Sequence, residues 1–435
     1  MGRPLPGGPT GNFSACTGVD TRLPTRIVET VNDQGSRKEA DRPAGRRVAT
    51  GVATVTGLAG AALLIAAWRC DQSWFLRHVF LPYYYAAPTP WASALRVTAA
   101  TLGAVLLGLA GKIGRAVQSL AGEAPGAGVW LAMVVALGAA ALVAEGTLRI
   151  AHLSWRESGF AGYEMRVGRK DPRYGWVTKA SHVTTLMMDG RSYTYAAGPS
   201  GLRAHAPNDE PDLGRPSLVV TGESIASGYG LNYDETFAAL CGHDLGLEVV
   251  DVAEGGYGFD QAYLRVTDLL PRIRHPVVLV TVFVPNQLGR SLRDDRPRLI
   301  LGDANRLEFL APATGLWARS RLGALIRDRV PYASTDAVAR SIALARAVFV
   351  ATAKEARARG AFPLFVVLSI GPPRALEAHP EAAILRALFI DPGLPYLLVD
   401  LDVPERFAVD SHPNVAGARR IAAAIEMALR PFGIH

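Results

Sequence analysis

The chain has 435 residues, of which 49% are hydrophobic and 20% are charged, and this balance excludes a disordered or fibrous protein. The formal net charge is +7, but no basic run is interleaved with aromatic residues, so a nucleic-acid partner is not expected. The three cysteines, Cys16, Cys70 and Cys241, form no CxxC pair and have no metal-ligand spacing, so neither a disulfide framework nor a zinc site is predicted.

Residues 1–48 form the first distinct segment. They are rich in Gly, Pro, Thr and Arg, carry eight basic against five acidic residues, and show no apolar periodicity. This composition predicts a disordered, basic cytoplasmic tail. The first apolar run begins only near Ala49, which argues against a secretory signal peptide.

Three apolar stretches follow between residues 49 and 150. Residues 49–68 and 124–144 contain no charge over 20 and 21 positions, and residues 92–111 are interrupted only by Arg96. About 20 apolar residues are enough to cross a bilayer as a helix, and the Gly and Ala content is typical of packed transmembrane helices. The sequence therefore predicts a transmembrane region of about three spans, rather than the buried helices of a soluble bundle.

The flanking charges predict the orientation of these spans. Arg46 and Arg47 precede the first span, and Lys112 and Arg115 lie between the second and the third. Because basic residues favour the cytoplasmic side, three spans place the chain after residue 150 outside the cytoplasm. Without the second span the sidedness inverts.

The remainder, residues 160–435, alternates between strands and helices. Helical patterns are clearest at 337–359 and at 413–429, where Pro413 suits a first helical turn. Nearly continuous Val- and Leu-rich runs indicate buried parallel strands at residues 217–221, 247–252, 277–284, 362–368 and 396–400. The alternation predicts an α/β fold with an open, doubly wound parallel sheet, which binds ligands at the carboxyl ends of its strands.

Residues with useful chemistry stand at the ends of the first three strands. Ser224 follows the first strand, Gly256 lies in a glycine-rich loop after the second, and Asn286 follows the third. A serine at such a turn can act as a nucleophile, a glycine lets a backbone N–H approach a ligand, and an asparagine can donate to an oxyanion. Each feature alone is typical of a plain cap or turn, whereas their combination is specific.

A histidine beside a carboxylate precedes the last helix. Asp410 lies two residues before His412, and an Asp in this place can orient a His as the general base of a Ser. Asp410 can also simply cap the final helix. The nearby alternatives for the acid are then Asp400 and Asp402, or the site is a Ser–His dyad.

Together these motifs resemble the SGNH hydrolases, also called GDSL esterases, over about residues 165–432. The family's blocks match, in chain order, Gly222-Glu223-Ser224, Gly256, Val284-Pro285-Asn286-Gln287 and Asp410-Ser411-His412-Pro413-Asn414. The departures are the Glu in the first block, the missing Gly and Asp of the third, and a last block one residue shorter, with Val409 where the acid usually stands. Upstream, Tyr174-Gly175-Trp176 and Gly201-Leu202-Arg203 look like the lead-in of membrane-anchored or secreted members.

The resemblance implies a three-layer α/β/α fold and a Ser-His-Asp triad. Ser224 would attack an ester carbonyl, His412 would act as general base, and Asp410 would orient its imidazole. The backbone N–H groups of Ser224 and Gly256 and the side chain of Asn286 would form the oxyanion hole. Neither a metal nor an organic cofactor is implied.

These expectations combine into an integral membrane protein with an extracytoplasmic ester hydrolase domain. O-acyl groups of envelope glycans or lipids are the candidate substrates. An O-acyltransferase would use the same acyl-enzyme and stays open as an alternative. The departures from the family blocks leave a further alternative, a catalytically inactive binding or assembly protein anchored in the membrane.

Overall fold

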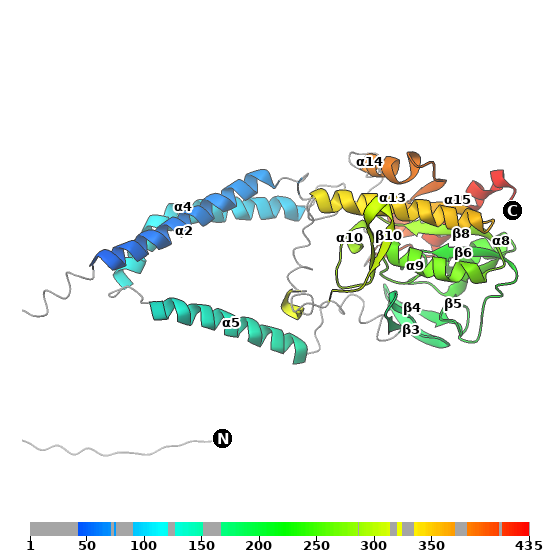
Figure 1. Ribbon diagram of the computed structural model, residues 1–435, viewed down its shortest axis with the longest axis horizontal. Coiled ribbons are helices and arrows are strands. Elements are labelled where there is room, and N and C mark those ends of the chain that lie inside the picture. The colour runs from blue at the N-terminus through cyan, green and yellow to red at the C-terminus, as the bar shows by residue number, and fades with distance from the viewer. Residues whose placement is uncertain are drawn as a thin grey trace, which may run out of the picture.

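The structure, a computed structural model, describes residues 42–70, 74, 90–120, 127–150, 167–285, 287–313, 320–323, 335–369, 381–408 and 411–434. The expected tail lies outside these residues up to residue 41. Figure 1 shows a group of long helices followed by a part in which helices surround a central sheet.

The long helices are α2 (Arg42–Arg69), α4 (Pro90–Leu120) and α5 (Ala127–Ile150), and α2 and α4 lie side by side (Figure 1). Two windows within the described residues, Thr50–Arg69 and Arg96–Ala116, are long and apolar enough to cross a membrane. Only 6% and 11% of these windows are buried among the described residues.

The described residues thus contain two such helices, not the three expected. The third expected span, 124–144, falls on α5, whose side chains are described only at Val135 and over residues 138–149. The last part of α5 contains the ion pair between Arg149 and Glu145, at 2.7 Å.

Two glycines bring α2 and α4 into close contact. A Cβ added to Gly60 would lie 2.8 Å from the carbonyl oxygen of Gly103, and a Cβ added to Gly103 would lie 2.8 Å from the carbonyl oxygen of Gly60. Neither helix has room for a side chain at this point. Helices in membranes commonly pack through small residues in this way.

We expect Gly103→Leu to separate the α2–α4 pair, because its side chain would meet the backbone of Gly60. The free energy of unfolding of the detergent-solubilised full-length protein should fall by about 1–3 kcal/mol. The matched control is Gly108→Leu on the same helix, where an added Cβ meets nothing within 4 Å. Equal stability of the two variants would contradict the close packing.

The central sheet consists of five parallel strands in the order β12-β11-β8-β6-β7. Their bounds are β6 Pro216–Thr221, β7 Glu248–Asp251, β8 His275–Phe283, β11 Phe362–Ser369 and β12 Tyr396–Asp400. All five expected strands are confirmed. The first strand, β6, lies between β7 and β8, so the chain winds in both directions from it, as in a doubly wound sheet.

Helices cover both faces of the sheet. Helices α8 (Phe237–Asp244) and α15 (Val415–Leu429) pack against each other on one face, and α9 (Phe259–Leu269) and α13 (Thr335–Ala358) on the other. The inner strands β6, β8 and β11 are buried on both sides, so their sequences are nearly continuous apolar runs, whereas the edge strand β12 exposes Tyr396 and Leu398. Both expected helices are present, as α13 and α15.

The start of α15 differs from the expectation. Asn414 is the N-cap residue, and its side chain accepts hydrogen bonds from the amides of Ala416 at 2.9 Å and Gly417 at 3.2 Å. Pro413 therefore precedes the helix instead of lying in its first turn. Pro413 forms an isolated antiparallel bridge with Arg406, which fixes the segment that leads into the helix.

Several antiparallel elements were not predicted. They are β1 Gly168–Asp171 with β2 Gly175–Thr178, then β3 His182–Met188, β4 Arg191–Ala197 and β5 Arg203–Ala204, and the hairpin of β9 Arg298–Leu301 with β10 Leu307–Leu310. The remaining short helices are η1 Tyr233–Glu235, η2 Leu270–Arg272, α10 Gln287–Arg290, η3 Asp303–Asn305, α14 Glu381–Leu385, η4 Arg386–Ile390, η5 Val403–Glu405 and η6 Arg430–Phe432.

Candidate active site

A tight turn after β6 presents Ser224 at the carboxyl edge of the sheet. Gly222 has φ 150°, and a Cβ added to it would lie 2.9 Å from the side chain of Ala226 and 3.1 Å from that of Val282. Only glycine fits this position without strain. The turn continues through a hydrogen bond from the amide of Tyr229 to the carbonyl of Ser224, at 2.9 Å.

His412 reaches the same place from the other end of the domain. Its Nε2 atom lies 2.8 Å from Oγ of Ser224, across 188 positions of sequence. The carbonyl of His412 accepts a hydrogen bond from the amide of Phe407 at 2.8 Å. The ring of Tyr229 lies 5.1 Å from the imidazole, centroid to centroid. The structure therefore brings together the serine and the histidine that the sequence placed at separate strand and helix ends.

The sequence did not predict the contact between Glu223 and Ser224. The carboxylate of Glu223 is buried, accepts a hydrogen bond from Oγ of Ser224 at 2.5 Å and another from the amide of Ile225 at 3.0 Å, and lies 3.4 Å from Nη1 of Arg290. Burial on its own would raise the pKa of Glu223. The charges of Arg290 and His412 and the two hydrogen bonds outweigh it and lower this pKa.

The loop after β7 supplies a second group near the serine. Gly256 has φ 77°, a conformation that favours glycine. The amide of Glu254 donates to the carbonyl of Gly222 at 3.4 Å, which ties this loop to the turn that carries Ser224. Within the described part of the chain, the amides of Ser224 and Gly256 donate to no protein acceptor.

The buried carboxylate of Glu254 connects this loop to β2 and α9. Glu254 accepts hydrogen bonds from the amide of Thr178 at 2.8 Å and from its hydroxyl at 2.9 Å. It also pairs with Arg265 of α9 at 2.9 Å, and the side chains of both are at least nine-tenths buried. The loop thus depends on a strand, β2, that lies far upstream in the sequence.

Aromatic contacts reinforce the same connection. Nε1 of Trp176 donates to the carbonyl of Gly255 at 2.9 Å, and the hydroxyl of Tyr257 donates to the carbonyl of Trp176 at 2.5 Å. The two rings meet edge to face with centroids 5.5 Å apart. The Tyr174-Gly175-Trp176 segment therefore packs directly on the loop that carries Gly256.

Two residues named by the sequence, Asn286 and Asp410, lie outside the described residues, as does Val409. Of the alternative acids, Asp402 lies at the start of η5 and pairs with Arg420 at 3.2 Å. Asp400 ends β12, and its Oδ1 atom is buried without a partner among the described residues.

A second buried carboxylate, Asp251, ends β7. Its Oδ1 atom accepts a hydrogen bond from the amide of Ala253 at 2.9 Å. Burial raises the pKa of Asp251 to about 7, because this effect outweighs the hydrogen bond and the charges of Arg203 and Arg265. Asp251 therefore titrates in the neutral range although it does not contact Ser224.

Raising the pH should reduce the stability of the fold through Asp251. The pKa of Asp251 is higher in the folded protein than in the unfolded chain, where it is near 4. The folded protein is therefore most stable with respect to this group below the unfolded pKa. It loses roughly 2–4 kcal/mol of this stability as the pH rises to about 7. Asp251→Asn should remove this loss, so its advantage over the natural protein should grow between pH 5 and pH 8 in urea unfolding. The exposed Asp234→Asn is the control, and the same pH dependence in both variants would contradict this assignment.

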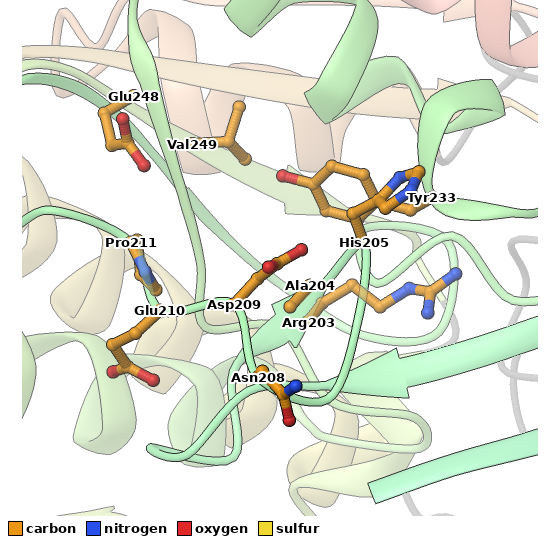
Figure 2. A pocket seen from close by; sticks show the side chains of 10 residues that line it. All are labelled: Arg203, Ala204, His205, Asn208, Asp209, Glu210, Pro211, Tyr233, Glu248 and Val249. Atoms are coloured by element: carbon orange, nitrogen blue, oxygen red, sulfur yellow. The ribbon is translucent and has the colours of Figure 1, made fainter. Parts of the chain in front are cut away.

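A cavity of about 410 Å³ lies at the edge of the sheet, between β5, the loop after it, η1 and β7 (Figure 2). It is lined by Arg203, Ala204, His205, Asn208, Asp209, Glu210, Pro211, Tyr233, Glu248 and Val249. Glu248 begins β7 and pairs with Ser217 near the start of β6. The cavity is therefore near the amino ends of the strands, opposite to Ser224.

The comparisons with known proteins give only distant likenesses. No protein-family model matches the chain, and no curated protein matches it. An acetyl xylan esterase from Butyrivibrio proteoclasticus is similar at 10% identity and a TM-score of 0.32, over 51% of this chain and 65% of that one. A family two carbohydrate esterase from Clostridium thermocellum has 14% identity and a TM-score of 0.31, over 54% and 69% of the two chains.

A putative lipolytic protein of the G-D-S-L family from Desulfitobacterium hafniense has 14% identity and a TM-score of 0.29, over 49% of this chain and 99% of that one. The chain spans slightly less than two thirds of the length of the acetyl xylan esterase. Likenesses at this level are too distant to assign a function. Among the described residues, no group of three or more His, Cys, Asp and Glu side chains could hold a metal ion.

Proposed function

We propose that this protein is a serine ester hydrolase of the SGNH type, anchored in a membrane. The observation that carries the proposal is the 2.8 Å contact between Oγ of Ser224 and Nε2 of His412 at the carboxyl edge of the parallel sheet. A hydroxyl within hydrogen-bond reach of an imidazole is the arrangement that activates a serine nucleophile. Ligands of open parallel sheets bind at this edge.

In the proposed reaction, Oγ of Ser224 attacks the ester carbonyl and its proton passes to Nε2 of His412. The amides of Ser224 and Gly256 bind the oxyanion, with the side chain of Asn286 as a proposed third donor. The tetrahedral intermediate collapses to an acyl-enzyme, and His412 returns the proton to the leaving alcohol. Water then resolves the acyl-enzyme by the same steps, and Asp410 is the proposed residue that orients His412.

The membrane anchor is proposed from α2 and α4, which are long, apolar and largely exposed. A catalytic domain outside the cytoplasm requires α5 as a third span, because two spans would return the chain to the side of its basic N-terminal flank. Acylated glycans or lipids of the cell envelope are then the proposed substrates. A reporter fused after the last residue that is active only in the cytoplasm would contradict this orientation.

A fluorophosphonate probe tests the proposal without knowledge of the substrate, because it reacts with an activated serine. We expect labelling of the full-length protein at Ser224, mapped by mass spectrometry. His412→Asn should slow labelling by about a hundredfold or more, since it removes the general base. The control is His243→Asn, whose side chain is 88% exposed at the end of α8.

Two outcomes would contradict the proposal. A folded protein that does not label would favour the binding or assembly protein. Labelling that is equally fast in His412→Asn would mean that the contact between Ser224 and His412 has no chemical role.

A further inference from the structure

The hydroxyl of Ser224 has one hydrogen and two close neighbours that can accept it. Oε2 of Glu223 lies 2.5 Å from Oγ, and Nε2 of His412 lies 2.8 Å from it. Only one of these two contacts can use the hydroxyl hydrogen. In the other contact the hydrogen must come from the neighbouring side chain, since otherwise a lone pair of Oγ would face a lone pair of that neighbour.

The surroundings of Glu223 decide which neighbour accepts. The charged groups that face its carboxylate are Arg290 on α10, at 3.4 Å, and His412 before α15. The amide of Ile225 donates to its other oxygen at 3.0 Å. These groups keep the pKa of Glu223 low in spite of burial. An ionised carboxylate only accepts hydrogen bonds, and it accepts them more strongly than a neutral group does.

The hydroxyl hydrogen of Ser224 therefore points to Glu223. His412 must then donate from Nε2 to Oγ, and a nitrogen that carries a hydrogen cannot take the serine proton. Glu223 does not replace His412 as the base, because a carboxylate with a lowered pKa is a weak proton acceptor at neutral pH. The contacts describe a serine that is held in place but not yet ready to attack.

We propose that Glu223 is a positioning residue that retains the hydroxyl hydrogen of Ser224 and holds the proposed hydrolase in a resting arrangement. This role rests on the proposed function. Attack requires that Nε2 of His412 is free of hydrogen and that the hydroxyl turns from Glu223 to it. The O–H bond then breaks, its proton passes to Nε2, and the bond from Oγ to the acyl carbon forms, while Glu223 gains and loses no proton.

The test is the rate of fluorophosphonate labelling of Glu223→Gln as a function of pH. A neutral amide competes less strongly for the hydroxyl hydrogen, so labelling near pH 7 should be about tenfold faster, the size of one charge-assisted hydrogen bond. The pH dependence of the rate should also shift, because the ionised competitor for the hydroxyl hydrogen is gone. Glu308→Gln on β10, an exposed site, is the matched control.

A second variant guards against misfolding, because Glu223→Gln leaves Arg290 without its counter-charge. Glu223→Gln/Arg290→Gln removes both charges and should show the same faster labelling and the same shift in pH. Folding of each variant is checked by circular dichroism and thermal unfolding. A purely structural role would lower the rate together with the melting temperature and leave the pH profile unchanged.

The outcomes separate this role from the proposed function. Labelling of the natural protein with no acceleration and no pH shift in the variants would overturn the role of Glu223 alone. Labelling of the natural protein that becomes faster in both variants would support both. No labelling of either folded protein would overturn both, since a serine released from Glu223 should react.

Discussion

Ser224→Ala should abolish hydrolysis of a short-chain aryl ester, with a loss of about a thousandfold or more in kcat. The reason is that Ser224 is the hydroxyl that lies 2.8 Å from His412 at the carboxyl edge of the sheet. Removing Oγ leaves no atom to form the acyl-enzyme. The amides that would bind the oxyanion belong to the backbone and remain, so a small residual rate is compatible with the proposal.

The fold should survive this change. Ser224 is buried beside Glu223, and loss of its hydroxyl removes one hydrogen bond from a carboxylate that keeps Ile225 and Arg290 as partners. The expected loss of stability is about 1–3 kcal/mol. Ser217→Ala is the control, because Ser217 is buried near the start of β6, the strand that precedes Ser224, and donates one hydrogen bond, to the carbonyl of Arg215. Normal turnover by folded Ser224→Ala would exclude Ser224 as the nucleophile.

The sheet could be predicted from the sequence because its inner strands are buried on both faces. Leu218 and Val220 pack on one side of β6 and Val219 on the other, so the run is apolar throughout. The positions of Ser224 and Gly256 at adjacent strand ends follow from this parallel arrangement. The apolar runs alone predicted that each residue follows the end of a strand, and the strand order came from the structure.

The antiparallel lead-in strands could not be predicted in this way. Strand β3 alternates between exposed and buried side chains, with Met187 63% exposed and Met188 buried, and β5 has two residues. Short, half-exposed strands give a weak apolar signal. The packing of Trp176 on Tyr257 depends on tertiary structure, and no local pattern encodes it.

The roles of single residues near the site could not be predicted from the sequence either. Glu223 was noted only as a departure from the family's Asp, yet its side chain reaches both Ser224 and Arg290. Pro413 was assigned to the first helical turn because proline suits that position. Asn414 caps the helix instead, since asparagine is among the strongest N-cap residues. For Pro413 the general preference of proline for the first helical turn gave the wrong position, because the neighbouring Asn414 caps the helix.

Glu254→Ala should destabilise the domain by about 3–5 kcal/mol, because it leaves the guanidinium of Arg265 buried without its partner. It also removes the acceptor for the amide and hydroxyl of Thr178. Urea unfolding measures the loss. The matched control is Glu248→Ala on β7, whose partner Arg215 is 60% exposed, so the pair should contribute at most about 1 kcal/mol.

The same substitution should reduce ester hydrolysis before the protein unfolds, because Glu254 fixes the loop that carries Gly256. Its amide bonds to the carbonyl of Gly222, and its side chain connects the loop to β2 and α9. A displaced Gly256 amide would bind the oxyanion less well, at a cost of about a hundredfold in kcat. Glu254→Gln keeps an acceptor for Thr178 but loses the charge opposite Arg265, so its rate should lie between those of the natural protein and Glu254→Ala. Full activity of folded Glu254→Ala would show that the loop keeps its position without this carboxylate.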